Sequence, residues 1–204
     1  MSRNANTVNI EQPPPEKRGY HHGDLRAALI DTGMALIEQR DAEQLSLREV
    51  ARLVGVSAPA VYRHFPEKAA LIEALAREGL NRLGAAQMAA ATRETSPIDA
   101  FNAIGRAYVR FAIAHPALFR MMMSFDPGAQ HFAHIPAGAA NPMKLLRDTV
   151  ASLAPPGTSA AMLRIVVLRA WAQVHGLAML MLDGQVPEDD ALIEGVIESR
   201  TFWG

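Results

Sequence analysis

The chain has 204 residues, half of them hydrophobic, and a formal net charge of −1 at pH 7. This length allows one or two compact domains with a sizeable core. The near-zero charge excludes nucleic-acid binding over the whole surface, so any such activity must lie in a local basic patch. There are no cysteines, which excludes disulfides and thiolate metal ligands and fits a reducing compartment.

The apolar segments are too short to predict a membrane span. The longest uncharged apolar run near the C-terminal end, Ala170 to Leu182, is interrupted by Gln173 and His175. It is shorter than the about 20 residues that cross a bilayer as a helix, and the first residues lack an apolar signal segment. We therefore expect a soluble, cytoplasmic protein with no membrane partner.

The spacing of apolar residues predicts an all-α protein. Apolar side chains recur at helical spacing over most of the chain, and no stretch alternates convincingly with the period of two that a strand requires. Residues 1–19 are polar and contain three consecutive prolines, so we expect a flexible tail there. Residues 126–142 are rich in proline, glycine and alanine and should form a loop. The predicted helices cover 24–39, 47–54, 58–65, 67–90, 97–114, 116–123, 143–153, 158–182 and 188–200.

Helix-end signals define two short helices in the first half of the chain. Ser46 and Glu49 fit a capping box at the start of the first. Gly55 ends it, because glycine is typical of the residue just past a helix end. The second begins at an N-cap serine, Ser57, with a proline in its first turn, where the missing N–H costs no hydrogen bond.

The second of these short helices has two different faces. On a helical wheel, Val61 and Phe65 share an apolar side that should dock on the preceding helix. The spacing of Ala51, Gly55 and Val61 is that of a helix-turn-helix, whose second helix enters the major groove of DNA. The alternative is a plain helical hairpin within a larger bundle. The two caps and a local net charge of +2 over 46–68 argue against that alternative.

The segment LSLREVARLVGVSAPAVYRHFPEKAALIEAL (45–75) resembles the DNA-binding domain of TetR-family transcriptional regulators. The resemblance covers about 22–75. It implies an all-helical dimer in which three helices bind DNA and a fourth leads into a ligand-binding and dimerisation domain. The segments YHHGDLR (20–26) and WAQVHG (171–176) are similar to the subgroup named for its Trp-His-Gly (WHG) C-terminal domain. The expected divisions are a tail over 1–19, a helix-turn-helix domain over 20–68, and a ligand-binding and dimerisation domain over 69–204.

The resemblance also implies which residues contact a double-stranded DNA operator. It places one arginine near DNA at the start of the second helix, and it turns the first residues of the third helix toward the groove. An aromatic, a histidine and a lysine should reach phosphates. The wheel adds Arg63, which points away from the core and could bind a phosphate or a guanine edge. The predicted DNA-binding residues are Arg48, Ser57, Ala58, Pro59, Ala60, Tyr62, Arg63, His64 and Lys68.

Two of these residues cannot form the hydrogen bonds to bases that a DNA-recognition helix uses. Ala58 and Ala60 cannot form bidentate hydrogen bonds to a base, so base discrimination should depend on Arg48, Arg63 and the shape of the DNA. The basic end of the tail, residues 17–18, either enters the minor groove or contacts nothing.

The helix predicted near the C-terminal end is apolar on almost every side. One small domain cannot cover such a helix, so a second copy of the chain should cover the rest. The helix that follows adds another apolar face, and two such helices per subunit would form a four-helix dimer seam. The alternative is a pair of helices within one chain. The predicted seam residues are Arg169, Leu177, Leu192, Gly195 and Val196.

The segment FRMMMSF (119–125) predicts either core filling or an adaptable apolar pocket. Few charged groups are available in this region, so the expected effector is a small hydrophobic or aromatic molecule. His175 is either a core histidine with one hydrogen-bond partner or a polar group in the pocket or the seam. The predicted pocket residues are Tyr108, Phe111, Phe119, Met122, Trp171, His175 and Met179. No cofactor is expected.

Catalysis is the rival class of function, and the sequence argues against it. His21 and His22 with Asp24, and His131 with His134, suggest metal ligands, but neither group is a closed ligand set. No nucleophile–base arrangement and no glycine-rich phosphate loop is present. We expect a repressor that a hydrophobic effector releases from a pseudo-palindromic operator. The alternatives are a helical protein-interaction adaptor and a TetR-like activator without a small-molecule ligand.

Overall fold

The computed structural model describes residues 25–39, 42–124 and 141–198. Within these ranges the chain is helical and has no strand, which confirms the all-α prediction. The elements are α1 (Leu25–Ile37), the 3₁₀ turn η1 (Ala42–Gln44), α2 (Leu47–Val54), α3 (Ala58–His64), α4 (Lys68–Ala91), α5 (Pro97–Ala114), α6 (Pro116–Ser124), α7 (Pro142–Leu153), α8 (Ala160–Leu182) and α9 (Asp190–Ile197).

The predicted helix boundaries agree with the structure to within about two residues, apart from two differences. The turn η1 was not predicted, and α9 ends at Ile197 rather than at residue 200. The predicted loop over 126–142 lies outside the described residues except for its last two, of which Pro142 opens α7. The predicted tail over 1–19 also lies outside them.

The predicted capping residues occupy the expected positions, but the two N-cap serines lack the expected side-chain hydrogen bond. Ser46 and Ser57 stand at N-cap positions with extended backbone, yet neither side chain makes a capping hydrogen bond. These helix starts are exposed, so their first N–H groups can bond to water instead. Gly55 has φ +79°, a left-handed conformation that glycine adopts without steric cost. This turn sets the angle between α2 and α3.

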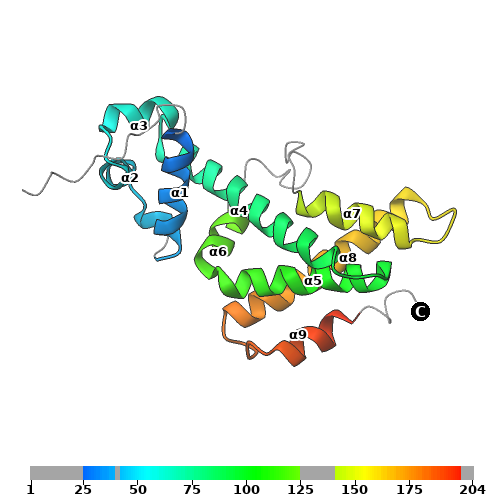
Figure 1. The fold of residues 1–204 in the computed structure, drawn as a ribbon. Helices are drawn as coiled ribbons and strands as arrows, with labels where there is room; N and C mark the ends of the chain where they lie inside the picture. The colour runs from blue at the N-terminus through cyan, green and yellow to red at the C-terminus, as the bar shows by residue number, and fades with distance from the viewer. Residues whose placement is uncertain (1–24, 40–41, 125–140, 199–204) are drawn as a thin grey trace, which may run out of the picture.

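Helix α4 connects the two halves of the molecule (Figure 1). The first three helices gather at one end, and α4 runs from them into a bundle formed with α5 to α9. It packs against α1 near its start and against α5, α6 and α7 further along. Two glycines allow these close contacts, because a Cβ would lie 2.9 Å from Leu75 at Gly33 and 2.8 Å from Met122 at Gly79.

The main hydrophobic core extends through both halves, and a smaller one lies between α5, α7 and α8. The main core joins the buried residues of α1 to α3 with those of α4, α5, α6, α8 and α9. At the same junction, His115 Nδ1, just after α5, lies 2.8 Å from a carboxylate oxygen of Glu38, just after α1. Close packing therefore joins α4 and α6 directly to the first three helices.

Helix α8 is only partly covered within one chain. Among the described residues it is the one helix that is long and apolar enough to cross a membrane, and 22% of its most apolar stretch is buried. One such helix is weak evidence for a membrane span. Its buried residues, Ala170, Leu177, Ala178 and Met181, face the protein's own core.

Candidate functional site

Helix α3 is held on α2 and α1 by two large side chains. Val61 and Phe65 are almost completely buried, as are Val50 and Ala51 on α2. The guanidinium of Arg26 lies 5.3 Å from the centre of the Phe65 ring, a distance that allows a cation–π contact. The predicted docking of α3 on the preceding helix is confirmed.

The opposite side of α3 faces solvent and carries most of the predicted DNA-binding residues. Ser57, Pro59, Tyr62, Arg63 and His64 are exposed, and Arg48 is exposed at the start of α2. Tyr62 stands out among them, with 42% of its surface exposed although it is large and aromatic. A short helix with a rigid apolar base and a basic, aromatic outer face fits the groove-binding helix of a helix-turn-helix.

Ala60 does not face outward as predicted. Its side chain is only 8% exposed, and Ala58 is half-buried. A methyl group projects too little to emerge between larger neighbours, so a position that the wheel turns outward is still covered. Ala58 and Ala60 therefore let α3 approach other surfaces closely, but they offer little surface of their own for base contacts.

Lys68 has a structural partner that the sequence did not reveal. Its ammonium group, at the start of α4, donates a hydrogen bond to the main-chain oxygen of Glu43 in η1 at 2.5 Å. An ammonium group has three donors, so Lys68 can hold η1 and still reach a phosphate. The phosphate contact stays a prediction.

A small cavity lies inside the bundle. Its volume is about 50 Å³, below the roughly 300–1,000 Å³ of typical ligand pockets. None of the residues that line it is charged. They come from α4 to α9: Leu80, Leu83, Gln87, Phe101, Ile104, Gly105, Tyr108, Met123, Pro142, Met143, Leu146, Ala170, Trp171, Gln173, Val174 and Ile197.

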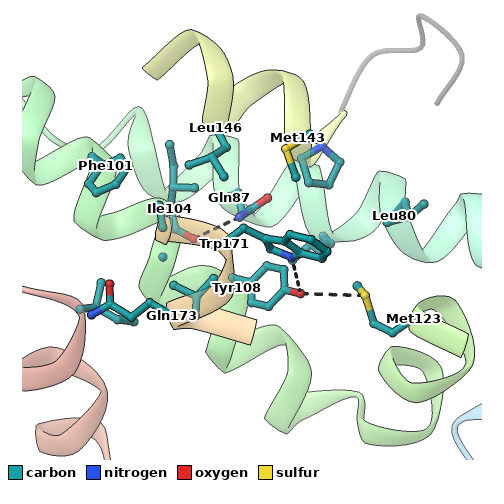
Figure 2. Close-up of a pocket in the computed structure, with 16 residues that line it drawn as sticks. Leu80, Gln87, Phe101, Ile104, Tyr108, Met123, Met143, Leu146, Trp171 and Gln173 are labelled. Atoms are coloured by element: carbon teal, nitrogen blue, oxygen red, sulfur yellow. Dashed lines mark hydrogen bonds between the residues drawn. The ribbon is translucent and has the colours of Figure 1, made fainter. Parts of the chain in front are cut away.

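Tyr108 is the centre of a polar network in the cavity wall (Figure 2). Its hydroxyl accepts a hydrogen bond from Trp171 Nε1 at 3.4 Å and lies 3.0 Å from His175 Nδ1 and 3.9 Å from Met123 Sδ. Burial raises the pKa of the Tyr108 hydroxyl well above its usual value of 10.0. Burial also lowers the pKa of His175 below 6.5, so both groups are neutral at pH 7.

Two of the seven predicted pocket residues, Tyr108 and Trp171, line this cavity. The other five do not line it, and their place in an effector site stays a prediction. Phe119 and His175 contact the Tyr108 ring edge-to-face, and Phe111 borders an open groove between α4 and α5. Met122 fills the close contact at Gly79, and Met179 packs against the main core. His175 is half-buried and lies 3.0 Å from the hydroxyl of the cavity residue Tyr108, and its role in a pocket stays a prediction.

The sequence reasoning missed the part of the cavity wall formed by α4. Leu80, Leu83 and Gln87 follow one another at spacings of three and four residues, so they share one face of the helix. A glutamine on an otherwise apolar face was the available signal. That signal is weak without knowing which helix faces α4.

The predicted seam residues fall into two groups. Arg169 and Gly195 are exposed, and Leu192 and Val196 are half-buried. Leu177 is buried in the protein's own core, so its assignment to the seam was wrong. The position of Leu177 around the helix axis places its side chain on the inner side of α8. The outer side instead exposes Met162, Ile165, Leu168 and Leu180.

The histidines considered as metal ligands, His21, His22, His131 and His134, lie outside the described residues. Within the described ranges no group of three or more histidine, aspartate or glutamate side chains could hold a metal ion.

Two family models match the chain. Residues 29–75 match the model described as bacterial regulatory proteins, tetR family. Residues 101–199 match the model described as tetracyclin repressor-like, C-terminal domain. Neither description names the WHG subgroup, which stays a prediction.

Solved structures share this architecture over almost the whole chain. A protein with unknown function from Rhodococcus sp. RHA1 is 31% identical, with a TM-score of 0.73, covering 92% of this chain and 97% of that one. A tetR-family transcriptional regulator from Streptomyces coelicolor is 23% identical, with a TM-score of 0.61 and coverage of 84% and 76%. A TetR variant from Acinetobacter baumannii AYE, solved in complex with minocycline, is 17% identical, with a TM-score of 0.57 and coverage of 85% and 92%. The last two show a common fold alone.

A curated relative matches part of the chain. The nucleoid occlusion factor SlmA of Haemophilus influenzae (strain PittGG) is 30% identical over 113 residues, which are 55% of this chain and 51% of SlmA. The chain thus spans about half the length of the curated relatives it matches.

Proposed function

Because the chain belongs to the TetR family of bacterial regulatory proteins, a class of DNA-binding transcription regulators, we propose that it is a ligand-responsive repressor. It acts as a cytoplasmic homodimer without catalytic activity. It binds a pseudo-palindromic operator through α3 and leaves it when a small hydrophobic effector enters the cavity of the bundle.

The observation that carries this proposal is that α4 belongs to both sites. Its first residue, Lys68, holds η1 of the DNA-binding half. About three to five turns further along, Leu80, Leu83 and Gln87 form one wall of the cavity. A rigid helix that lines a cavity at one end and supports a DNA-binding unit at the other can couple the two.

In the dimer, two copies of α3 would enter successive major grooves on one side of the DNA, about 34–36 Å apart. The exposed apolar side of α8 supports a seam that sets this separation, because Met162, Ile165 and Leu168 recur at helical spacing on a surface that one chain leaves uncovered. Such a face needs a partner of the same kind to bury it.

The cavity must enlarge to hold an effector, because about 50 Å³ accepts little more than water. Met123 and Met143 in its wall have flexible side chains that can move aside. An effector then favours whichever position of α4 leaves the cavity open. DNA release follows only if that position separates the two copies of α3 by a distance that fits the operator less well.

Fluorescence anisotropy with labelled DNA from the region upstream of the protein's own gene tests the proposal. We expect Arg63→Ala to weaken binding about tenfold and to lower the salt dependence by about one phosphate contact per subunit. Arg147→Ala is the matched control, since it removes the same charge from an exposed position on α7.

A lack of binding by the unmodified protein even at low salt would refute DNA binding to this region. Equal effects of the two substitutions would refute the role of α3. A thermal-shift screen of hydrophobic molecules supplies candidate effectors for the same anisotropy assay. If the protein binds the DNA and none of these compounds releases it, the ligand-responsive part of the proposal is wrong.

A further inference from the structure

The cavity wall contains one buried amide that the sequence analysis did not consider. Gln87 lies on α4, is only 4% exposed and lines the cavity among mostly apolar residues. Figure 2 shows its amide between Trp171 and the α7 residues Met143 and Leu146. A glutamine at such a position costs free energy unless both ends of its amide are hydrogen-bonded.

Only one end of the Gln87 amide is paired. Its Nε2 donates to the main-chain oxygen of Ile104 on α5 at 3.2 Å. Its Oε1 accepts no hydrogen bond from any residue in the described part of the chain. Rotating the amide to exchange Nε2 and Oε1 is unfavourable, because Oε1 would then lie against the main-chain oxygen of Ile104. The contact with Ile104 therefore fixes the orientation and leaves Oε1 as the buried, unpaired acceptor of a residue that lines the cavity.

The other side-chain donor groups in the described wall each have a hydrogen-bond partner elsewhere. Trp171 Nε1 donates to the Tyr108 hydroxyl, and Gln173 Nε2 donates to the main-chain oxygen of Val196. The single proton of the Tyr108 hydroxyl has His175 and Met123 as its partners. A molecule that enters the cavity is then the donor that Gln87 Oε1 lacks among the described residues.

We propose that the effector is an uncharged, mostly apolar molecule with one hydroxyl or N–H group that donates a hydrogen bond to Gln87 Oε1. This inference rests on the proposed function and specifies the chemistry of its ligand. A ligand that enlarges the cavity and reaches this buried oxygen supplies the hydrogen bond that it lacks, whereas a ligand without a donor leaves it unpaired.

The same wall disfavours an anionic ligand. None of its residues is cationic, and an ionised carboxylate would place its oxygens against Gln87 Oε1 without a donor between them. Burying such a charge without a partner costs more than burying a neutral group. The described wall therefore favours neutral molecules over ionised fatty acids and aromatic acids.

Three probes of similar shape test this chemistry: 1-naphthol, 1-methoxynaphthalene and 1-naphthoate, titrated into the full chain by isothermal calorimetry. We expect 1-naphthol to bind at least about tenfold more tightly than its methyl ether, the effect of leaving a buried acceptor unpaired. The naphthoate should bind most weakly. Equal affinities of naphthol and ether, tighter binding of the naphthoate, or no binding of any probe would overturn the inference.

Two variants locate the effect. Gln87→Met replaces the amide with an apolar side chain of similar length and should abolish the preference for naphthol over the ether. Asn102→Leu is the matched control, because Asn102 is also buried, also has an amide oxygen without a partner among the described residues, and does not line the cavity. Asn102→Leu should retain the preference. If the preference survives in Gln87→Met, or disappears equally in both variants, Gln87 is not the acceptor.

Operator binding by the same preparation separates this inference from the proposed function. A protein that binds the operator but shows no donor preference refutes the effector chemistry and leaves DNA binding intact. A clear donor preference without operator binding refutes the proposed function and leaves the ligand site in place.

Discussion

Replacing Leu168 with glutamate should separate the proposed dimer. Leu168 lies on the outer side of α8 with 58% of its surface exposed. Full burial of a leucine side chain contributes about 1.5–3 kcal/mol, so the exposed part still has about 1–1.5 kcal/mol to gain in a seam. Glutamate loses that gain and also requires burial of a carboxylate, which adds a further cost. Over two copies we expect a loss of about 5 kcal/mol, or at least a thousandfold weaker dimer.

Sedimentation equilibrium over a concentration series measures this change directly. Met88→Glu is the control, because Met88 on α4 is also large, apolar and 44% exposed but lies on neither α8 nor α9. Leu168→Glu should be monomeric at micromolar concentration and should lose operator affinity, whereas Met88→Glu should stay dimeric. A dimer of unchanged affinity in Leu168→Glu, or dissociation of both variants, would refute the assignment of the seam to α8.

Three further outcomes follow from buried groups. Phe65→Ala should lower the free energy of unfolding by about 3–5 kcal/mol. Tyr62→Ala should change it by less than about 0.5 kcal/mol and still weaken operator binding. Equal stability losses of the two variants in denaturant titrations would contradict the different burial of the two rings. Gln87→Met removes an unpaired oxygen along with one hydrogen bond, so chemical denaturation should show unchanged stability or a gain of about 1 kcal/mol; a clear loss would mean that the oxygen is paired. Because burial lowers the pKa of His175 below 6.5, the unfolded chain takes up that proton first as the pH falls. Stability should therefore decrease below about pH 6.5, and the melting temperature of His175→Gln should fall less steeply with pH.

The DNA-binding half was predictable because its signals are local. The glycine at position 55, the capping positions of Ser46 and Ser57, and the spacing of Val61 and Phe65 all depend on residues within a few positions of one another. Local signals also set the helix boundaries, which the structure reproduces closely. They did not predict the bond from Lys68 to Glu43, since that contact joins residues 25 positions apart.

The cavity could not be predicted in the same way. Met and Phe residues on α6 indicated a pocket, but Phe119 and Met122 fill the core between α6, α4 and α5. A side chain's hydrophobicity does not reveal whether it faces a cavity or a neighbouring helix, because both environments are apolar. Only the relative placement of α4, α7 and α8 brings Gln87, Met143 and Trp171 to the same wall.

The sequence by itself determined the helices, the seat of α3 and the family, because periodicity, caps and a continuous motif are properties of neighbouring residues. Tertiary structure decided which face of each helix is covered. It turned Leu177 inward, left Leu168 outside, covered Ala60 and placed Gln87 beside a cavity with an amide oxygen that has no partner among the described residues. These outcomes depend on contacts between residues far apart in the chain, and packing at near-crystalline density leaves each side chain only the space that its neighbours define.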